Sequence, residues 1–89
     1  IATPTTPFPA FDTGIDMPRD GRGKKWQDWN IFNAFANLAR LPSASLPMGM
    51  TADGLPVGLQ LSGRYLDDLL VMKAAKKLEA ATGLQRFSF

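Results

Sequence analysis

Serine and lysine are the residues in this sequence that could carry catalysis, because the chain contains neither histidine nor cysteine. A Ser-His-Asp arrangement and thiol chemistry are therefore impossible within these 89 residues. A serine can instead be activated by a buried lysine that acts as a base. The candidates are Ser43, Ser45, Ser62 and Ser88, with Lys24, Lys25, Lys73, Lys76 and Lys77. No S-x-x-K spacing occurs, and the lysines fall in a loop or on the polar side of a helix. We therefore predict no catalytic residue in this chain.

Metal and cofactor motifs are missing as well. Zinc sites of the usual kind need histidine or cysteine, and the carboxylates lack the spacing of a calcium loop. The segment Gly21-Arg-Gly23 is too short for a phosphate-binding loop, and no G-x-x-x-x-G-K-[ST] sequence occurs. We expect no metal and no cofactor.

Composition indicates a folded chain with few specialised partners. Hydrophobic residues make up 45%, which suits one small domain or a piece of a larger one, covering residues 1–89. The net charge of +2 is too small to predict nucleic-acid binding. No apolar run approaches the roughly 20 residues that cross a bilayer, so we expect no membrane partner. The absence of cysteine fits a reducing compartment, and we expect a cytoplasmic protein.

The first half of the chain reads as an extended segment, a loop and a helix. Prolines keep residues 1–9 extended and exclude a central strand there. Residues 12–25 are rich in glycine and charge, and we expect a mobile loop. From Trp26 to Ala39 the apolar spacing predicts a helix that Pro42 ends. Its apolar face consists of Trp29, Phe32, Phe35, Ala36 and Ala39.

The second half reads as a hairpin followed by a helix. Residues 43–50 are extended, but Pro47 argues against a regular central strand. Asp53-Gly54 marks the turn, and the next seven or so residues alternate apolar with small or polar side chains. Gly83 is placed to end the last helix. The predicted apolar side of that helix is Leu66, Leu70, Val71, Ala74, Leu78 and Ala81. Packing on a sheet is favoured over a membrane-surface helix, because the apolar residues are short and many are alanine.

The hairpin sequence resembles the C-terminal part of amidase signature enzymes. It reads P-x-x-S-L-P-x-G from Pro42, then D-G-L-P-V-G-L-Q-L-x-G-R from Asp53 to Arg64. The resemblance implies carboxamide chemistry by a Ser–cis-Ser–Lys triad, and that triad would lie upstream of this chain. It also implies an α/β fold, here a partial mixed β-sheet built from extended segment, helix, hairpin and helix, as the C-terminal part of an α/β/α fold.

The same resemblance implies substrate-binding residues at the start of the first helix. These are Trp29, Asn30 and Phe32. The tRNA-dependent amidotransferase branch has an ammonium-binding Asp where this chain has Asn30, and Gly where it has Arg40. Both departures favour the general amidase branch. The alternative is that the aromatics are core and that Asn30 caps a helix.

Two hypotheses follow for the whole chain. In the first it is the C-terminal fragment of an amidase, partnered by the remainder of that enzyme and a small-molecule amide. Its start without Met, inside an extended segment, favours truncation or processing. In the second it is a non-catalytic interaction module that binds a partner or forms a homo-oligomer through its hairpin.

Overall fold

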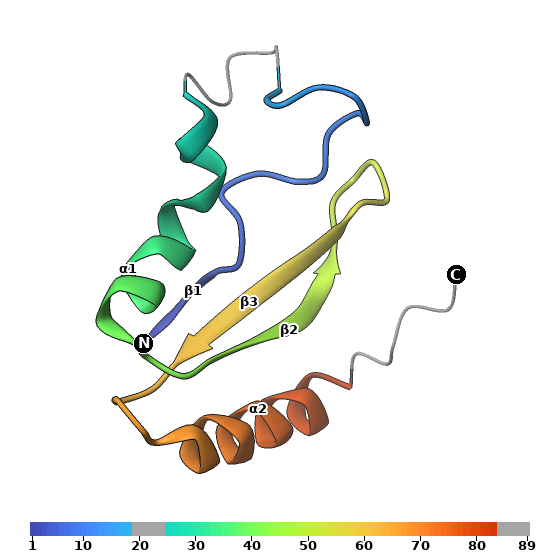
Figure 1. Ribbon diagram of the computed structural model, residues 1–89. Helices are drawn as coiled ribbons and strands as arrows, with labels where there is room; N and C mark the ends of the chain where they lie inside the picture. The colour runs from blue at the N-terminus through green and yellow to red at the C-terminus, as the bar shows by residue number, and fades with distance from the viewer. Residues whose placement is uncertain (19–24, 84–89) are drawn as a thin grey trace.

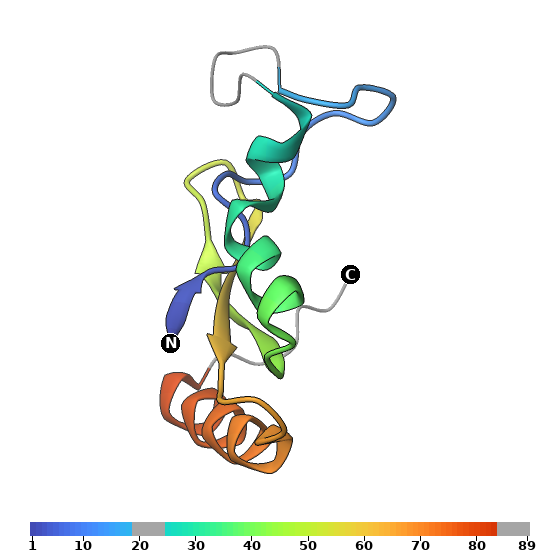
Figure 2. The ribbon, with the colours of Figure 1, turned by 60° about the vertical axis from the view of Figure 1, so that its left-hand side comes forward.

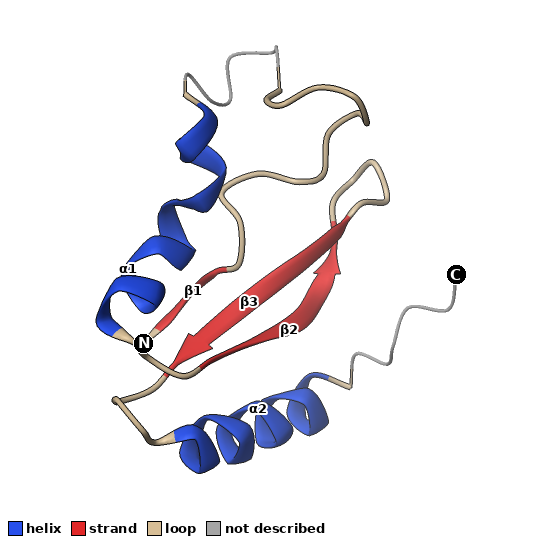
Figure 3. Cartoon of the chain, in the orientation of Figure 1, coloured by secondary structure: helices blue, strands red, loops and turns tan. Residues whose placement is uncertain are grey.

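The computed structural model describes residues 1–18 and 25–83 of the chain. The elements follow the predicted order of extended segment, helix, hairpin and helix (Figures 1 and 3). They are β1 (Ala2–Pro4), the 3₁₀ helix η1 (Trp26–Asn30), α1 (Ile31–Ala39), β2 (Ser43–Met50), β3 (Pro56–Ser62) and α2 (Asp68–Thr82). Residues 12–18 of the predicted loop contain neither helix nor strand, while residues 19–24 lie outside the described residues.

The three strands form an antiparallel sheet in the order β1-β3-β2. Both proline-containing edge positions suit a residue that cannot donate to a neighbouring strand. Pro4 ends β1, and the register of β2 shifts between Pro47 and Gly49. The predicted mixed sheet is not seen among the described strands, because all of their pairings are antiparallel.

The hairpin turn lies where Asp53-Gly54 predicted it. The Gly54 N–H donates to the Thr51 carbonyl at 3.0 Å, and Gly54 has a φ of 80°. This left-handed conformation favours glycine. The Thr51 hydroxyl accepts from the Leu55 N–H at 3.0 Å and fixes the end of the turn.

The two faces of the sheet differ sharply in polarity. Strand pairing places a set of hydroxyl and amide side chains on one face: Thr3, Thr5, Ser43, Ser45, Gln60 and Ser62. Leu59 and Leu61 point to the other face. Helix α1 covers the polar face, where the Gln60 side-chain amide donates to the Phe32 carbonyl at 3.1 Å. Gln60 and Ser62 are only 5% and 6% exposed, so the polar side of β3 is its more buried side.

The first predicted helix is divided into two kinds of helix. Trp26–Asn30 is a 3₁₀ helix, and the α-helical turns begin at Ile31. Of the predicted apolar face, Ala36 is buried, but Ala39 is exposed, which corrects the prediction for that residue. Ala39 lies at the last turn, next to the left-handed Arg40 that ends the helix. Figure 2 shows this helix running in front of the sheet.

The second helix packs beside β2 through a narrower stripe than the sequence predicted (Figure 1). Val71 and Ala75 are its buried residues, whereas Leu70 is 48% exposed. Leu66 precedes the helix rather than belonging to its apolar side. The predicted stripe is wrong in these respects because the helix meets the sheet mainly along β2, with fewer contacts to β3. Gly83 ends it in the left-handed conformation, as predicted. Among the described residues, no helix has the length and apolarity needed to cross a membrane.

Candidate functional site

The described serines are held in hydrogen bonds across the sheet. Ser43 Oγ lies 2.8 Å from Ser62 Oγ, and Ser45 Oγ lies 2.7 Å from Thr5 Oγ1. Each partner is another hydroxyl, which is too weak a base to activate a nucleophile. Ser88 and Lys24 lie outside the described residues. These cross-strand pairs stabilise the sheet, and they offer no nucleophile–base pair.

The start of the first helix carries the three residues predicted to bind substrate. The Lys25 N–H donates to the Asp28 carboxylate at 3.0 Å, which satisfies one of the free N–H groups at this end. Trp29, Asn30 and Phe32 are all half-buried. Asn30 stands at the N-cap position of α1 but makes no side-chain capping hydrogen bond. The alternative interpretation of Asn30 as a capping side chain is therefore not supported.

Trp29 lines a cavity of about 520 Å³ between the N-terminal segment and the hairpin. We call this the aromatic cavity, and its principal lining residues are Phe8, Phe11, Ile15, Asp16, Trp29 and Pro56. Phe8 is buried, and its ring centroid lies 6.1 Å from that of Phe11. The Thr6 hydroxyl donates to the Phe8 carbonyl at 3.0 Å and fixes the backbone there. Neither Asn30 nor Phe32 lines this cavity.

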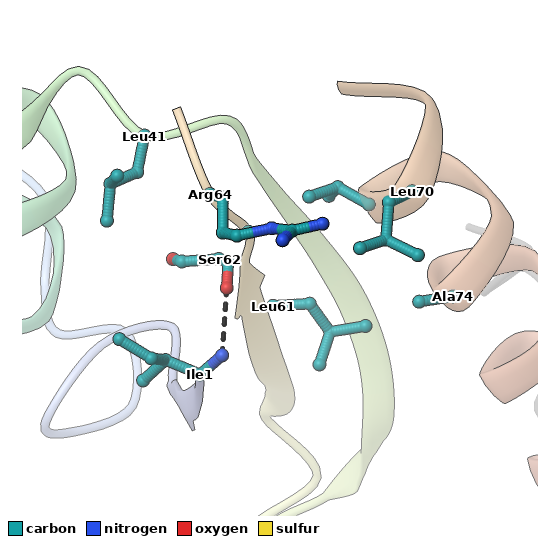
Figure 4. A pocket seen from close by; sticks show the side chains of 9 residues that line it. Ile1, Leu41, Leu61, Ser62, Arg64, Leu70 and Ala74 are labelled. Atoms are coloured by element: carbon teal, nitrogen blue, oxygen red, sulfur yellow. Dashed lines mark hydrogen bonds between the residues drawn. The ribbon is translucent and has the colours of Figure 1, made fainter. Parts of the chain in front are cut away.

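A second cavity, of about 550 Å³, lies between the sheet and α2 (Figure 4). Its lining is apolar, with Leu61 pointing toward Leu70 and Ala74, while Ser62 points away toward Leu41. Arg64 lies beside it and forms an ion pair with Asp67 at 3.0 Å. We call this the apolar cavity. It holds no chemically reactive group, so it is a packing surface rather than a site of catalysis.

Sequence reasoning found Trp29 but missed the other members of the aromatic cavity. Phe8 and Phe11 lie in a proline-rich segment without helical or strand periodicity, and Asp16 lies in the following loop. No spacing rule connects such residues with a helix that begins ten or more positions later. The available signal was the presence of two phenylalanines in a segment that is otherwise small or polar.

Comparison with known proteins decides the family. A family model described as Amidase matches residues 1–72. The chain belongs to the amidase family. Two relatives, each named as one of the subunits of glutamyl-tRNA(Gln) amidotransferase, are similar to it, from Xanthobacter autotrophicus (39% identical) and Cereibacter sphaeroides (42% identical). Each alignment covers 93% of this chain and 16% of the relative.

A solved hydrolase structure has a similar fold. It is that of 6-aminohexanoate cyclic dimer hydrolase, which is 29% identical and superposes with a TM-score of 0.67. The match covers 93% of this chain and 19% of the hydrolase. The chain thus spans less than a fifth of the length of these relatives, and it corresponds to an amidase-family segment with an α/β arrangement.

Proposed function

We propose that this chain is the C-terminal portion of an amidase that hydrolyses carboxamide bonds through a Ser–cis-Ser–Lys triad outside these 89 residues. The observation that carries the proposal is the family match over residues 1–72, in a chain that spans only 16% of its relatives. In the reaction, the upstream serine oxygen attacks the amide carbonyl carbon. The C–N bond breaks, the amine leaves with a proton, and water then cleaves the acyl ester. The absence of cysteine supports a cytoplasmic enzyme.

The remainder of that amidase is the partner that we propose for the exposed apolar surface. Leu38, Leu66 and Met72 are 86%, 76% and 66% exposed, although each is a large apolar side chain. Apolar surface on this scale is characteristic of an interaction face. The apolar cavity beside α2 continues it. A homo-oligomer that uses the same surface is the alternative, and it corresponds to a non-catalytic interaction module.

Within the assembled enzyme, we propose that Trp29, Asn30 and Phe32 line the pocket for a small-molecule amide. We favour the general amidase branch because of Asn30, since a neutral amide binds an ammonium group more weakly than a carboxylate does. Arg40 supports this branch less than its sequence position suggested. It ends α1 in the left-handed conformation, where glycine is preferred for backbone reasons alone.

A second candidate is the amidase-family component of a tRNA-dependent amidotransferase. It is favoured by the 39% and 42% identity to proteins named for that enzyme. The two candidates predict different substrates. A general amidase releases ammonia or an amine from simple amides, whereas the amidotransferase component uses glutamine as its ammonia source.

The test is expression of the chain joined to its upstream coding sequence. The extended protein should hydrolyse simple amides, and this activity should be lost when the upstream catalytic serine is replaced by alanine. The 89-residue chain alone should show no hydrolysis. Hydrolysis by the chain alone, abolished by changing one of its own serines, would contradict the proposal. Activity on glutamine but not on other amides would assign the protein to the second candidate.

A further inference from the structure

The aromatic cavity combines aromatic rings with a single carboxylate. Phe8 and Phe11 come from the N-terminal segment, Trp29 from η1, and Asp16 from the loop between them. These residues are separated in sequence, and only the fold brings them together. Apart from Asp16, the principal lining side chains are uncharged.

The Asp16 carboxylate is available to a ligand. It is exposed, and across residues 1–18 and 25–83 it makes neither a hydrogen bond nor an ion pair. The nearby Asp28 differs, because it accepts from the Lys25 N–H. Asp16 is therefore the negative group of this cavity that has no partner within the described chain.

Such a lining discriminates between ligands by charge. The face of an aromatic ring attracts a cation by about 0.5–1 kcal/mol at an exposed site. An exposed carboxylate adds about 0.2–1 kcal/mol to binding of the same cation. A neutral ligand of equal length gains only apolar contacts, and an anionic one is repelled by the carboxylate. The cavity is therefore suited to a cation that carries an apolar chain.

We propose that the aromatic cavity binds a primary ammonium group on a short alkyl chain, with the ammonium group at Asp16 and the chain against the aromatic side chains. This assignment deepens the proposed function and rests on it in one respect: hydrolysis of an N-alkyl amide releases a primary amine, which is protonated at neutral pH. The cavity would then receive the amine half of the substrate or product.

The test is a titration of the 89-residue chain with hexylammonium chloride, followed by the indole N–H signal of Trp29 in nuclear magnetic resonance spectra. A Trp26→Phe variant assigns that signal. Hexanol and sodium hexanoate are the matched neutral and anionic probes. We expect hexylammonium to bind most tightly and hexanoate most weakly. Equal dissociation constants for hexylammonium and hexanol would overturn the proposal.

Variants locate the charge. Asp16→Asn should weaken hexylammonium binding about two- to fivefold, while Asp16→Glu should keep most of the affinity. Asp12→Asn is the matched control, since Asp12 is exposed in the same segment but does not line the cavity. Equal losses for Asp16→Asn and Asp12→Asn would show a non-specific charge effect and would also overturn the proposal.

A final comparison separates a ligand site from a packing site. The protein extended by its upstream sequence should bind hexylammonium as the short chain does. If binding is lost in the extended protein, the cavity is filled by protein and the proposal fails. Catalysis plays no part in these titrations, so their outcome is independent of whether the extended protein hydrolyses amides.

Discussion

The Thr5 and Ser45 hydroxyls form a 2.7 Å hydrogen bond that bridges the central strand at Gly58. Thr5 follows β1 and donates its N–H to the Gly58 carbonyl, while Ser45 belongs to β2 on the other side of β3. A Cβ atom at Gly58 would lie 2.7 Å from Thr5 Oγ1 and 3.1 Å from Ser45 Oγ. The glycine is therefore required by a hydrogen bond between its two neighbouring strands.

Gly58→Ala should consequently destabilise the chain by about 1–3 kcal/mol, because the new methyl group displaces both hydroxyls. Urea unfolding followed by circular dichroism measures the effect. Thr5→Ala removes the closest atom, so Gly58→Ala should cost less in that background than in the natural chain. Equal costs in both backgrounds would show that the hydrogen bond does not constrain this position.

Gly63 is predicted to be equally restrictive at the approach to α2. A Cβ atom there would lie 2.5 Å from Val71 Cγ2, and Val71 is one of the buried residues of α2. Gly63→Ala should lower the free energy of unfolding by about 1–3 kcal/mol by pushing α2 away from the sheet. Measured in a Val71→Ala background, the same substitution should have a clearly smaller effect. Additive effects would contradict this account.

Arg40→Gly is predicted to stabilise the chain. Arg40 has φ and ψ of 56° and 41°, and the following Leu41 N–H donates to the Ala36 carbonyl at 2.9 Å. Relief of left-handed strain exceeds the extra entropy of glycine in the unfolded chain, for a net gain of about 0.5–1 kcal/mol. A thermal melt would detect a higher midpoint. Arg40→Ala keeps the strain and should give no gain, which makes it the control.

Thr3→Val is a second substitution expected to stabilise. Thr3 Oγ1 is buried on the polar face of the sheet without a hydrogen-bond partner among the described residues. Valine has a similar shape but no hydroxyl, so it removes the penalty of about 1–3 kcal/mol for a buried unpaired group. Thr3→Ser retains the hydroxyl and should not stabilise. If Thr3→Val lowers the urea midpoint, the hydroxyl has a partner in solution.

Asn30→Asp tests the substrate branch in the protein extended upstream. A carboxylate at this position should improve use of amides that carry a free α-ammonium group, such as glutamine, by lowering KM several-fold. The hydrolysis of amides without an ammonium group should change little. Ammonia release from both substrate types gives the comparison. An unchanged KM for glutamine would remove Asn30 from the proposed pocket.

The order of elements could be predicted because its signals are local. Asp53-Gly54 marked the hairpin, Gly83 marked the end of the last helix, and the prolines marked edge strands. The burial of the strands could not be predicted in the same way. Alternation in β3 distinguishes two faces, but it does not say that α1 lies over Gln60 and Ser62 and makes that polar face the more buried one.

The candidate site divides along the same line. The sequence alone determined the family, through the hairpin pattern, and the absence of histidine and cysteine. Only the tertiary structure decided that Trp29 meets Phe8, Phe11 and Asp16, and that the serines pair with other hydroxyls. Motifs and turns depend on residues close together in the chain, whereas cavities depend on packing between distant segments, which no local spacing encodes.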